Sequence, residues 1–161
     1  WIPKLKQLLL IIAESAPFKP NISALSNKIG INRETLLAYL HHLAEGGLIR
    51  SLYKAGKGVS RLQKPDKIYL DNPNLAYVLR PSAPNIGTVR ETYFANQLAY
   101  RHQVSYPQAG DFLVDQQYIF EVGGPNKKGR QLEGTSGFLA IDRIELGYQN
   151  RIPLWLFGFL Y

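Results

Sequence analysis

The fold of the first half of the chain is decided by residues 23–49, which read SALSNKIGINRETLLAYLHHLAEGGLI. Two runs of apolar residues recur here at helical spacing, formed by Leu25 and Ile29 and then by Leu36, Leu37, Leu40 and Leu43. Between the runs, Gly30 is a typical C-terminal stop and Asn32 is a typical N-cap, and Gly46 ends the second run. The stretch therefore predicts a short helix, a tight turn and a longer helix.

The segments around this helix pair complete a small domain. Residues 3–15 predict a preceding amphipathic helix, and residues 48–53 and 67–70 predict two strands. A helix pair with a tight turn is the helix-turn-helix signature, and with the two strands the first half resembles a winged-helix domain. Prolines and asparagines are frequent in residues 71–85, which favours a linker with a boundary near Arg80. We expect a winged-helix domain in residues 1–80 and a second domain in residues 81–161.

Positive charge is concentrated in the first half of a chain whose formal net charge is +7. Residues 1–80 contain 12 Lys and Arg against 5 Asp and Glu, whereas residues 81–161 contain seven of each kind. Six basic residues fall between positions 50 and 67, where only Asp66 is acidic. A basic hairpin of this kind binds nucleic-acid phosphates without reading base sequence. The residues expected to contact phosphate are Arg33, Arg50, Lys54, Lys57, Arg61, Lys64 and Lys67.

Two other interpretations of the first half stay open. A solvated surface loop accounts for the same hairpin charges. The longer helix of the pair is also a weak candidate for reading bases, because its outer positions offer few donors besides Arg33 and include Glu34 and Glu45. Many winged helices dock on proteins, so a protein partner is the alternative to DNA.

The second half predicts a small unit that carries three carboxylates. Residues 88–102 predict an amphipathic helix with Glu91 in its first turns. Residues 111–114 and 117–122 predict a β-hairpin that places Asp111 opposite Phe120 or Glu121. Adjacent carboxylates repel each other, so their pairing needs an explanation. One explanation is a divalent metal such as Mg²⁺ or Mn²⁺, which prefers oxygen ligands. The alternatives are exposure at a strand end or pairing with a downstream cation. The candidate cations are Lys127, Lys128 and Arg130.

The order of a helix with Glu91, a strand with Asp111 and a strand with Glu121 resembles the restriction-endonuclease-like nuclease core. That family has an Asp followed at a distance by Glu-x-Lys, often with an acid on the preceding helix. The resemblance implies an α/β domain in which Glu91, Asp111 and Glu121 are catalytic, and in which Asp111 and Glu121 hold Mg²⁺ or Mn²⁺. Gly123 stands where the family has its lysine, which stabilises charge and helps to orient the attacking water. Lys127 is then the candidate for that role. We expect a degenerate nuclease-like domain, with an active metal-dependent nuclease as an alternative.

The chain as a whole resembles the C-terminal region of an uncharacterised bacterial family of AAA-type ATP-binding proteins. The most specific part of the resemblance is residues 152–161, IPLWLFGFLY, which also predict a strand buried on both faces. The resemblance implies an ATPase domain before Trp1, as a partner of this region. Nothing in the sequence matches the phosphate-binding Gly-x-x-x-x-Gly-Lys-Ser/Thr motif, so we expect ATP to bind only in that upstream domain.

The composition excludes several other classes of protein. The absence of cysteine excludes disulfides and thiolate metal sites, and it suits a reducing cytoplasm. No run reaches the roughly 18–20 apolar residues that a membrane span needs. We therefore expect a cytoplasmic α/β (α+β) protein that binds nucleic acid. The alternative function is a protein-interaction module that docks on the ATPase domain or on another partner.

Overall fold

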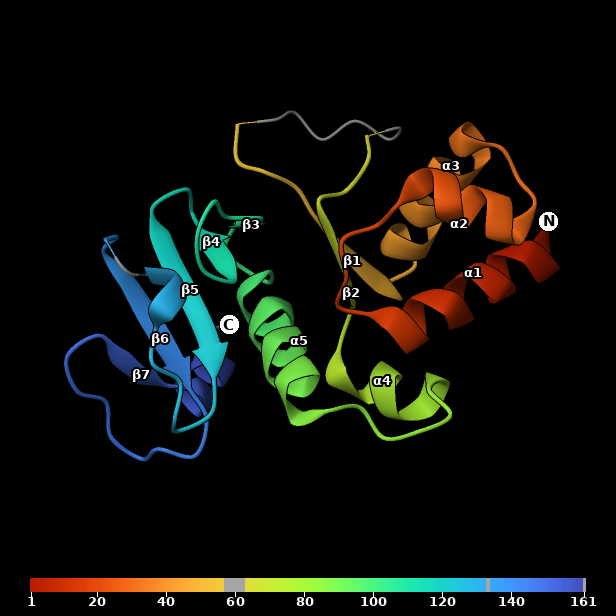
Figure 1. The fold of residues 1–161 in the computed structure, drawn as a ribbon. Coiled ribbons are helices and arrows are strands. Elements are labelled where there is room, and N and C mark those ends of the chain that lie inside the picture. The colour runs from red at the N-terminus through yellow and green to blue at the C-terminus, as the bar shows by residue number, and fades with distance from the viewer. Residues whose placement is uncertain (57–62, 133, 161) are drawn as a thin grey trace. The chain divides into compact units, whose positions relative to one another are not determined.

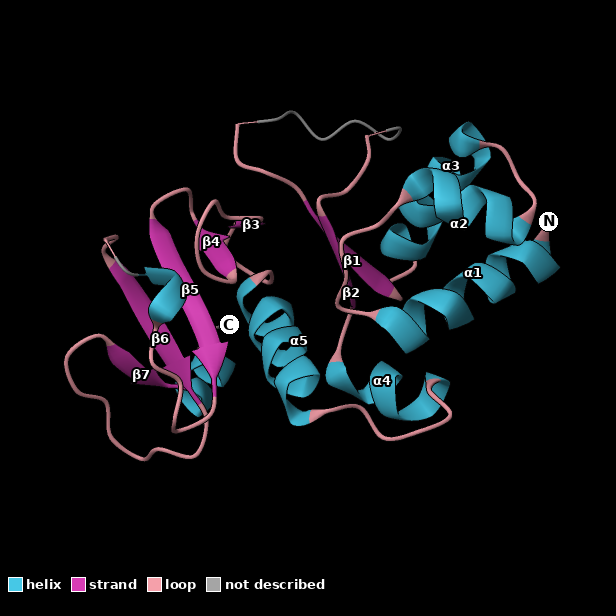
Figure 2. Cartoon of the chain, viewed as in Figure 1, coloured by secondary structure: helices cyan, strands magenta, loops and turns pink. Residues whose placement is uncertain are grey.

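The computed structural model describes residues 1–56, 63–132 and 134–160 of the chain. The chain divides into two compact units, Trp1–Pro84 and Asn85–Tyr161. Each unit combines helices with a β-sheet of its own, so the fold is of the mixed α and β type (Figure 2). Among the helices of the described ranges, none is both long and apolar enough to cross a membrane.

The first unit consists of helices around a two-stranded sheet (Figure 1). Its elements are α1 (Ile2–Ser15), α2 (Ile22–Ile29), α3 (Arg33–Glu45), β1 (Ile49–Leu52), β2 (Lys67–Leu70) and α4 (Pro73–Leu79). Short polar side chains set the helix starts, because Asn21 and Asn32 each accept a hydrogen bond from the backbone N–H three residues later. Gly30 ends α2 in the left-handed conformation at φ 69°. The turn between α2 and α3 therefore follows from the local sequence.

One hydrophobic core holds the first unit together. Leu8 and Ile12 of α1 and Leu36 of α3 are fully buried in it. The sheet contributes Ile49 and Ile68 to the same core, and β1 pairs antiparallel with β2. Because these apolar side chains come from every layer, the core fixes the two strands on which the basic hairpin begins and ends.

Helix α4 lies in the segment that the sequence predicts as a linker. Asn72 caps this helix by accepting hydrogen bonds from two backbone N–H groups of its first turn, and Pro73 suits the first helical position. Ala76 is buried against the core of the first unit. The asparagines and prolines here mark a helix start as well as a connection. The division between the two compact units falls after Pro84, and the sequence predicts it near Arg80.

The second unit is a five-stranded mixed sheet with a helix on one face (Figure 1). Its elements are α5 (Ile86–Leu98), β3 (Val104–Ser105), β4 (Phe112–Val114), β5 (Tyr118–Gly123), the 3₁₀ turn η1 (Arg130–Leu132), β6 (Gly137–Ile141), β7 (Arg151–Pro153) and the 3₁₀ helix η2 (Leu154–Phe159). The strand order is β3-β4-β5-β6-β7, antiparallel from β3 to β5 and parallel from β5 to β7.

Aromatic rings fill the space between α5 and the sheet. The ring of Phe94 on α5 lies 5.0 Å from that of Phe112 and 5.1 Å from that of Phe120, measured between centroids. Phe157 of η2 joins the group at 4.9 Å from Phe94. Side chains alternate along a strand, so Phe120 on this face requires Ile119 and Glu121 to lie on the opposite face of β5. That alternation sets the side of the sheet on which the candidate site forms.

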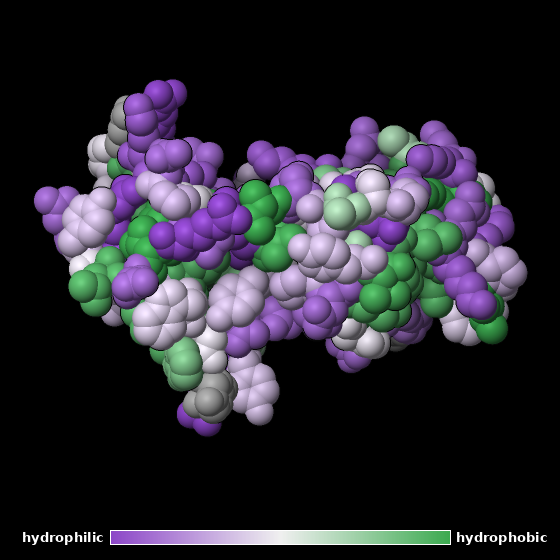
Figure 3. Space-filling model, turned by 90° about the horizontal axis from the view of Figure 1, so that it is seen from below, coloured by the Kyte–Doolittle hydropathy of each residue, from purple (hydrophilic) through white to green (hydrophobic). Residues whose placement is uncertain are grey.

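The apolar C-terminal run differs from the expected buried strand. Only Arg151–Pro153 pairs with β6, and the chain then turns into η2. In a 3₁₀ helix, side chains three apart share a face. Leu154 and Phe157 accordingly face the core, while Trp155, Leu156 and Phe159 are exposed. Apolar side chains reach the surface elsewhere too, as Figure 3 shows for one face of the molecule, where they lie among polar ones.

Candidate functional site

The β4–β5 hairpin brings two acidic side chains together at its open end. Phe112 pairs with Phe120, and beyond this pair the Asp111 N–H donates to the Phe120 carbonyl at 2.8 Å. The Asp111 carboxylate in turn accepts the N–H of Val122 at 2.8 Å. Asp111 is thus buried at the end of the hairpin's hydrogen-bond ladder, and its side chain accepts a backbone N–H of β5. The Asp111 carboxylate therefore lies beside the stretch of β5 that carries Glu121.

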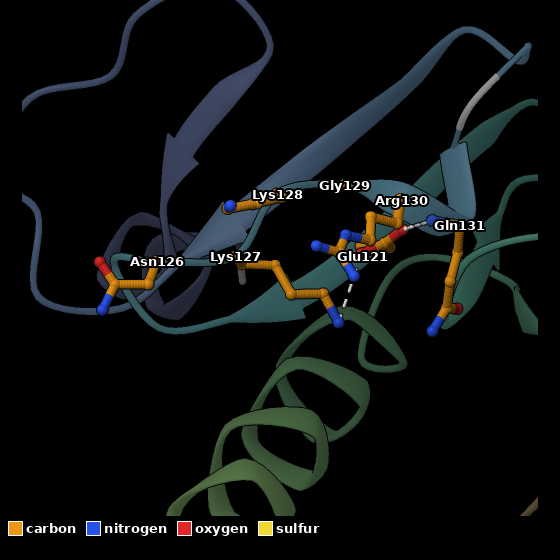
Figure 4. A pocket seen from close by; sticks show the side chains of 7 residues that line it. All are labelled: Glu121, Asn126, Lys127, Lys128, Gly129, Arg130 and Gln131. Carbon is orange, nitrogen blue, oxygen red and sulfur yellow. Dashed lines mark hydrogen bonds and ion pairs between the residues drawn. The ribbon is translucent and has the colours of Figure 1, made fainter.

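Glu121 is the most deeply buried charged residue in the described ranges, with 1% of its surface exposed. Its Oε1 accepts the backbone N–H of Gln131 in η1 at 2.6 Å. Its Oε2 lies 3.3 Å from the Nζ of Lys127 (Figure 4). The same Nζ lies 3.7 Å from Oδ2 of Asp111. One ammonium group therefore faces both carboxylates. The two oxygens that face it, Oδ2 of Asp111 and Oε2 of Glu121, are separated by no more than these two distances added together.

Gly123 explains how Lys127 reaches this position. A side chain at Gly123 would begin only 2.8–2.9 Å from Cβ, Cγ and Cδ of Lys127. The aliphatic part of Lys127 therefore lies against the strand where the nuclease pattern expects a lysine side chain to start. Gly123 leaves the space and Lys127 fills it, although the two residues are four positions apart in the sequence.

Arg151 of β7 holds the loop that carries Lys127. Its guanidinium donates to the carbonyl of Lys127 at 3.1 Å and to that of Pro125 at 2.8 Å. The loop also closes on itself, because the N–H of Lys127 donates to the Gly124 carbonyl at 3.0 Å. The ring of Tyr148 stacks on the Arg151 guanidinium at 5.4 Å. Hydrogen bonds thus hold both the backbone N–H and the backbone carbonyl of Lys127.

A surface pocket of ≈ 390 Å³ opens beside these groups (Figure 4). The residues that line it are Glu121, Asn126, Lys127, Lys128, Gly129, Arg130 and Gln131. Three of them are cations, and the only acid among them already faces Lys127. Lys128 and Arg130 are exposed. The lining of the pocket therefore carries more positive than negative charge.

The described residues fit a divalent metal poorly. Mg²⁺ needs close to six oxygen ligands at roughly 2.0–2.1 Å. Asp111 and Glu121 direct one oxygen each at an ammonium group, and each also accepts a backbone N–H. In the described ranges, no group of three or more His, Cys, Asp or Glu side chains is placed to hold a metal ion. Glu91, half-buried on α5, therefore does not complete such a group with Asp111 and Glu121.

The basic residues of the first unit have different surroundings. Lys57 and Arg61 lie outside the described residues. Arg33, Lys54 and Lys64 are exposed. Two other predicted phosphate contacts are engaged within the protein: Arg50 pairs with Asp71 at 2.6 Å, and the Nζ of Lys67 lies 5.0 Å from the ring centre of Tyr69.

A pair formed by His102 and Asp115 is absent from the sequence prediction. His102 follows α5, and its Nδ1 lies 2.7 Å from the carboxylate of Asp115 in the β4–β5 turn. The hydrogen bond with His102, and next the one from the Gln103 N–H, lower the pKa of Asp115 below its ordinary value. The pair ties the end of α5 to the hairpin. No motif predicts it, because the two residues meet only once the sheet has formed.

Comparison with known proteins identifies no relative of this chain. No protein-family model matches it, and neither a curated protein nor a solved structure is significantly similar.

Proposed function

We propose that this chain is a nucleic-acid-binding region of an AAA-type ATPase-linked protein, made of a winged-helix domain and a nuclease-like domain that binds phosphate without cutting it. The observation that carries the proposal is the pocket in the second unit, whose lining combines Lys127, Lys128 and Arg130 with one acid, which is already paired with Lys127. Such a lining attracts the phosphate of a nucleic acid, and none of the described residues that form it is an exposed acid.

The first unit supports the same function. The order of α1, α2, α3, β1 and β2, with a tight turn before α3, is that expected of a winged helix. Lys54 and Lys64 are exposed on the arms of the β1–β2 hairpin, and Arg33 is exposed at the start of α3. Contacts from flexible lysines to phosphates position a protein on DNA without selecting a sequence. We therefore expect binding with little sequence preference.

The salt dependence of DNA binding tests the proposal. Affinity for a labelled duplex is measured by fluorescence anisotropy at several salt concentrations, for the unaltered chain and for two double variants. These are Lys54→Gln with Lys64→Gln in the hairpin, and Lys128→Gln with Arg130→Gln in the pocket. Each lost phosphate contact lowers the slope of log affinity against log salt by about 0.9, so each double variant should lower it by about 2.

The control is Lys6→Gln, which removes an exposed lysine of α1 that belongs to neither site. This variant should bind as the unaltered chain does. Absence of binding at low salt, or binding that none of the changes weakens, refutes the proposal. Incubation of the duplex with Mg²⁺ or Mn²⁺ tests the nuclease alternative. We expect no cleavage, and cleavage that Glu121→Gln abolishes would establish the active enzyme instead.

A protein-interaction module is the second candidate, and the exposed aromatic residues of η2 favour it. Trp155 is 51% exposed and Phe159 is 65% exposed, and their rings meet edge to face at 6.0 Å. Aromatic side chains of this kind are enriched at protein interfaces. Binding to a separately produced ATPase domain that Trp155→Ala and Phe159→Ala abolish, without loss of DNA binding, would show that η2 serves docking.

A further inference from the structure

Lys127 has the surroundings of a bound cation. Its Nζ lies within 4 Å of one oxygen of Asp111 and one oxygen of Glu121. The opposite oxygen of Glu121 is engaged by the Gln131 N–H, and Asp111 is anchored to the N–H of Val122. Both carboxylates are therefore held in place by backbone groups, and each directs one oxygen at the same ammonium group. Burial strengthens the attraction between these charges, because water screens the charges of a 1% exposed carboxylate very little.

The loop is built to keep the ammonium group at that point. Arg151 holds the peptide of Lys127 from β7, and Gly123 leaves the space that the aliphatic part of Lys127 fills. The side chain of Lys127 is 28% exposed, so it enters from the solvent side of the two acids. A divalent ion that bridged Asp111 and Glu121 would need to displace this ammonium group. The described residues offer no third acid or histidine as a further ligand for that ion.

We propose that Lys127 is a built-in cation that replaces a divalent metal between Asp111 and Glu121, so that the native site does not take up Mg²⁺ or Mn²⁺. The protein itself thereby supplies a cation that compensates one of the two negative charges. Removal of the ammonium group leaves two desolvated carboxylates facing one another, an arrangement that favours binding of an external cation. The inference concerns the same pocket as the proposed function, but it does not depend on whether nucleic acid binds there.

The test measures Mn²⁺ binding by titration calorimetry to the full chain and to Lys127→Met, which keeps the length of the aliphatic stem and removes the charge. Lys6→Met is the control, because this exposed lysine of α1 belongs to the first unit and to neither site. We expect Mn²⁺ binding to Lys127→Met to be at least about tenfold tighter than to the unaltered chain. Lys6→Met should bind Mn²⁺ as the unaltered chain does. A further change of Glu121→Gln should abolish the gain.

Two results overturn the proposal. One is Mn²⁺ binding to the unaltered chain that Glu121→Gln removes. The other is a folded Lys127→Met that binds Mn²⁺ no more tightly than the unaltered chain. If Lys127→Met is unfolded in metal-free buffer, its near-UV circular dichroism is measured with and without Mn²⁺. Recovery of the folded signal on addition of Mn²⁺ supports the proposal, and failure to recover contradicts it. Failure of DNA binding leaves these readouts unchanged, so the two proposals can fail separately.

Discussion

Substitution of Gly123 by alanine tests how the acidic pair is organised. The new Cβ would lie 2.8–2.9 Å from three carbons of Lys127, far closer than van der Waals contact allows. The peptide of Lys127 cannot move away easily, because Arg151 holds its carbonyl and that of Pro125. The side chain must therefore yield, and we expect its ammonium group to leave Asp111 and Glu121.

The cost has two parts that the structure defines. Overpacking by one methyl group costs about 1–3 kcal/mol. Breaking a buried ion pair costs about 3–5 kcal/mol when one charge stays buried. If Lys127 moves away to relieve the clash, the overpacking cost disappears but the cost of the broken ion pair takes its place. Lys127 is 28% exposed, so its loss belongs at the lower end of that range. We expect the free energy of unfolding of the second unit to fall by about 3 kcal/mol.

The assay is urea unfolding followed by the fluorescence of Trp155 in a Trp1→Phe background, so that the signal comes from the second unit alone. The double variant Gly123→Ala with Lys127→Gly provides the coupling, because glycine at 127 removes all three close contacts. Alanine at 123 should then cost little. If Gly123→Ala lowers stability by less than about 0.5 kcal/mol, or costs the same with and without Lys127, the packing argument is wrong.

Three further predictions concern other parts of the fold. Asn32→Ala removes the cap bond to the Thr35 N–H and should destabilise the first unit by about 1 kcal/mol in urea unfolding followed by circular dichroism, whereas Asn32→Ser should retain most of the stability. Phe94→Ala empties a fully buried ring site and should cost the second unit about 3–5 kcal/mol by the Trp155 fluorescence assay, and a loss below about 1 kcal/mol would contradict the aromatic core. The lowered pKa of Asp115 stabilises the fold at pH values above the ordinary value of 3.8, and this contribution is lost as the pH falls through the lowered value. Asp115→Asn should therefore flatten the acid side of a plot of urea midpoint against pH, and an unchanged plot would show that the bond to His102 does not contribute.

Much of the fold is predictable from short-range patterns. Asn32 and Gly30 are residues whose local chemistry favours a helix start and a helix end, and the structure uses them so. The β4–β5 hairpin is similarly local, because alternation and a short turn limit where Asp111 can fall relative to Glu121. These features depend on a few neighbouring residues, so no tertiary contact is needed to infer them.

The C-terminal run shows where such patterns become ambiguous. A continuous apolar stretch is compatible with a buried strand and with a short helix that is only partly covered. The structure resolves the choice by burying Leu154 and Phe157 and exposing Trp155. That choice depends on the space left by α5, which the run itself does not encode.

The position of Lys127 could not be predicted for a different reason. A loop lysine has many rotamers, and by itself a turn rich in glycine gives it no fixed place. Arg151, the residue that holds this loop, is 24 positions away in sequence and joins it only through the parallel order of β5, β6 and β7. The nuclease pattern predicted from the sequence places a lysine where this chain has Gly123. It does not show that the absence of a side chain there creates the space in which Lys127 lies.

The same arrangement changes how the charge of the second unit should be interpreted. Its seven acidic and seven basic residues suggest a surface with no preference for anions. Burial breaks that balance locally, because Asp111 and Glu121 are turned inward and face Lys127, while Lys128 and Arg130 stay exposed at the same pocket. A ligand that approaches the pocket meets the two exposed cations before the screened acids. A neutral unit can therefore present a positive site, and the net charge of a domain is a poor guide to its partner when its acids are buried and paired.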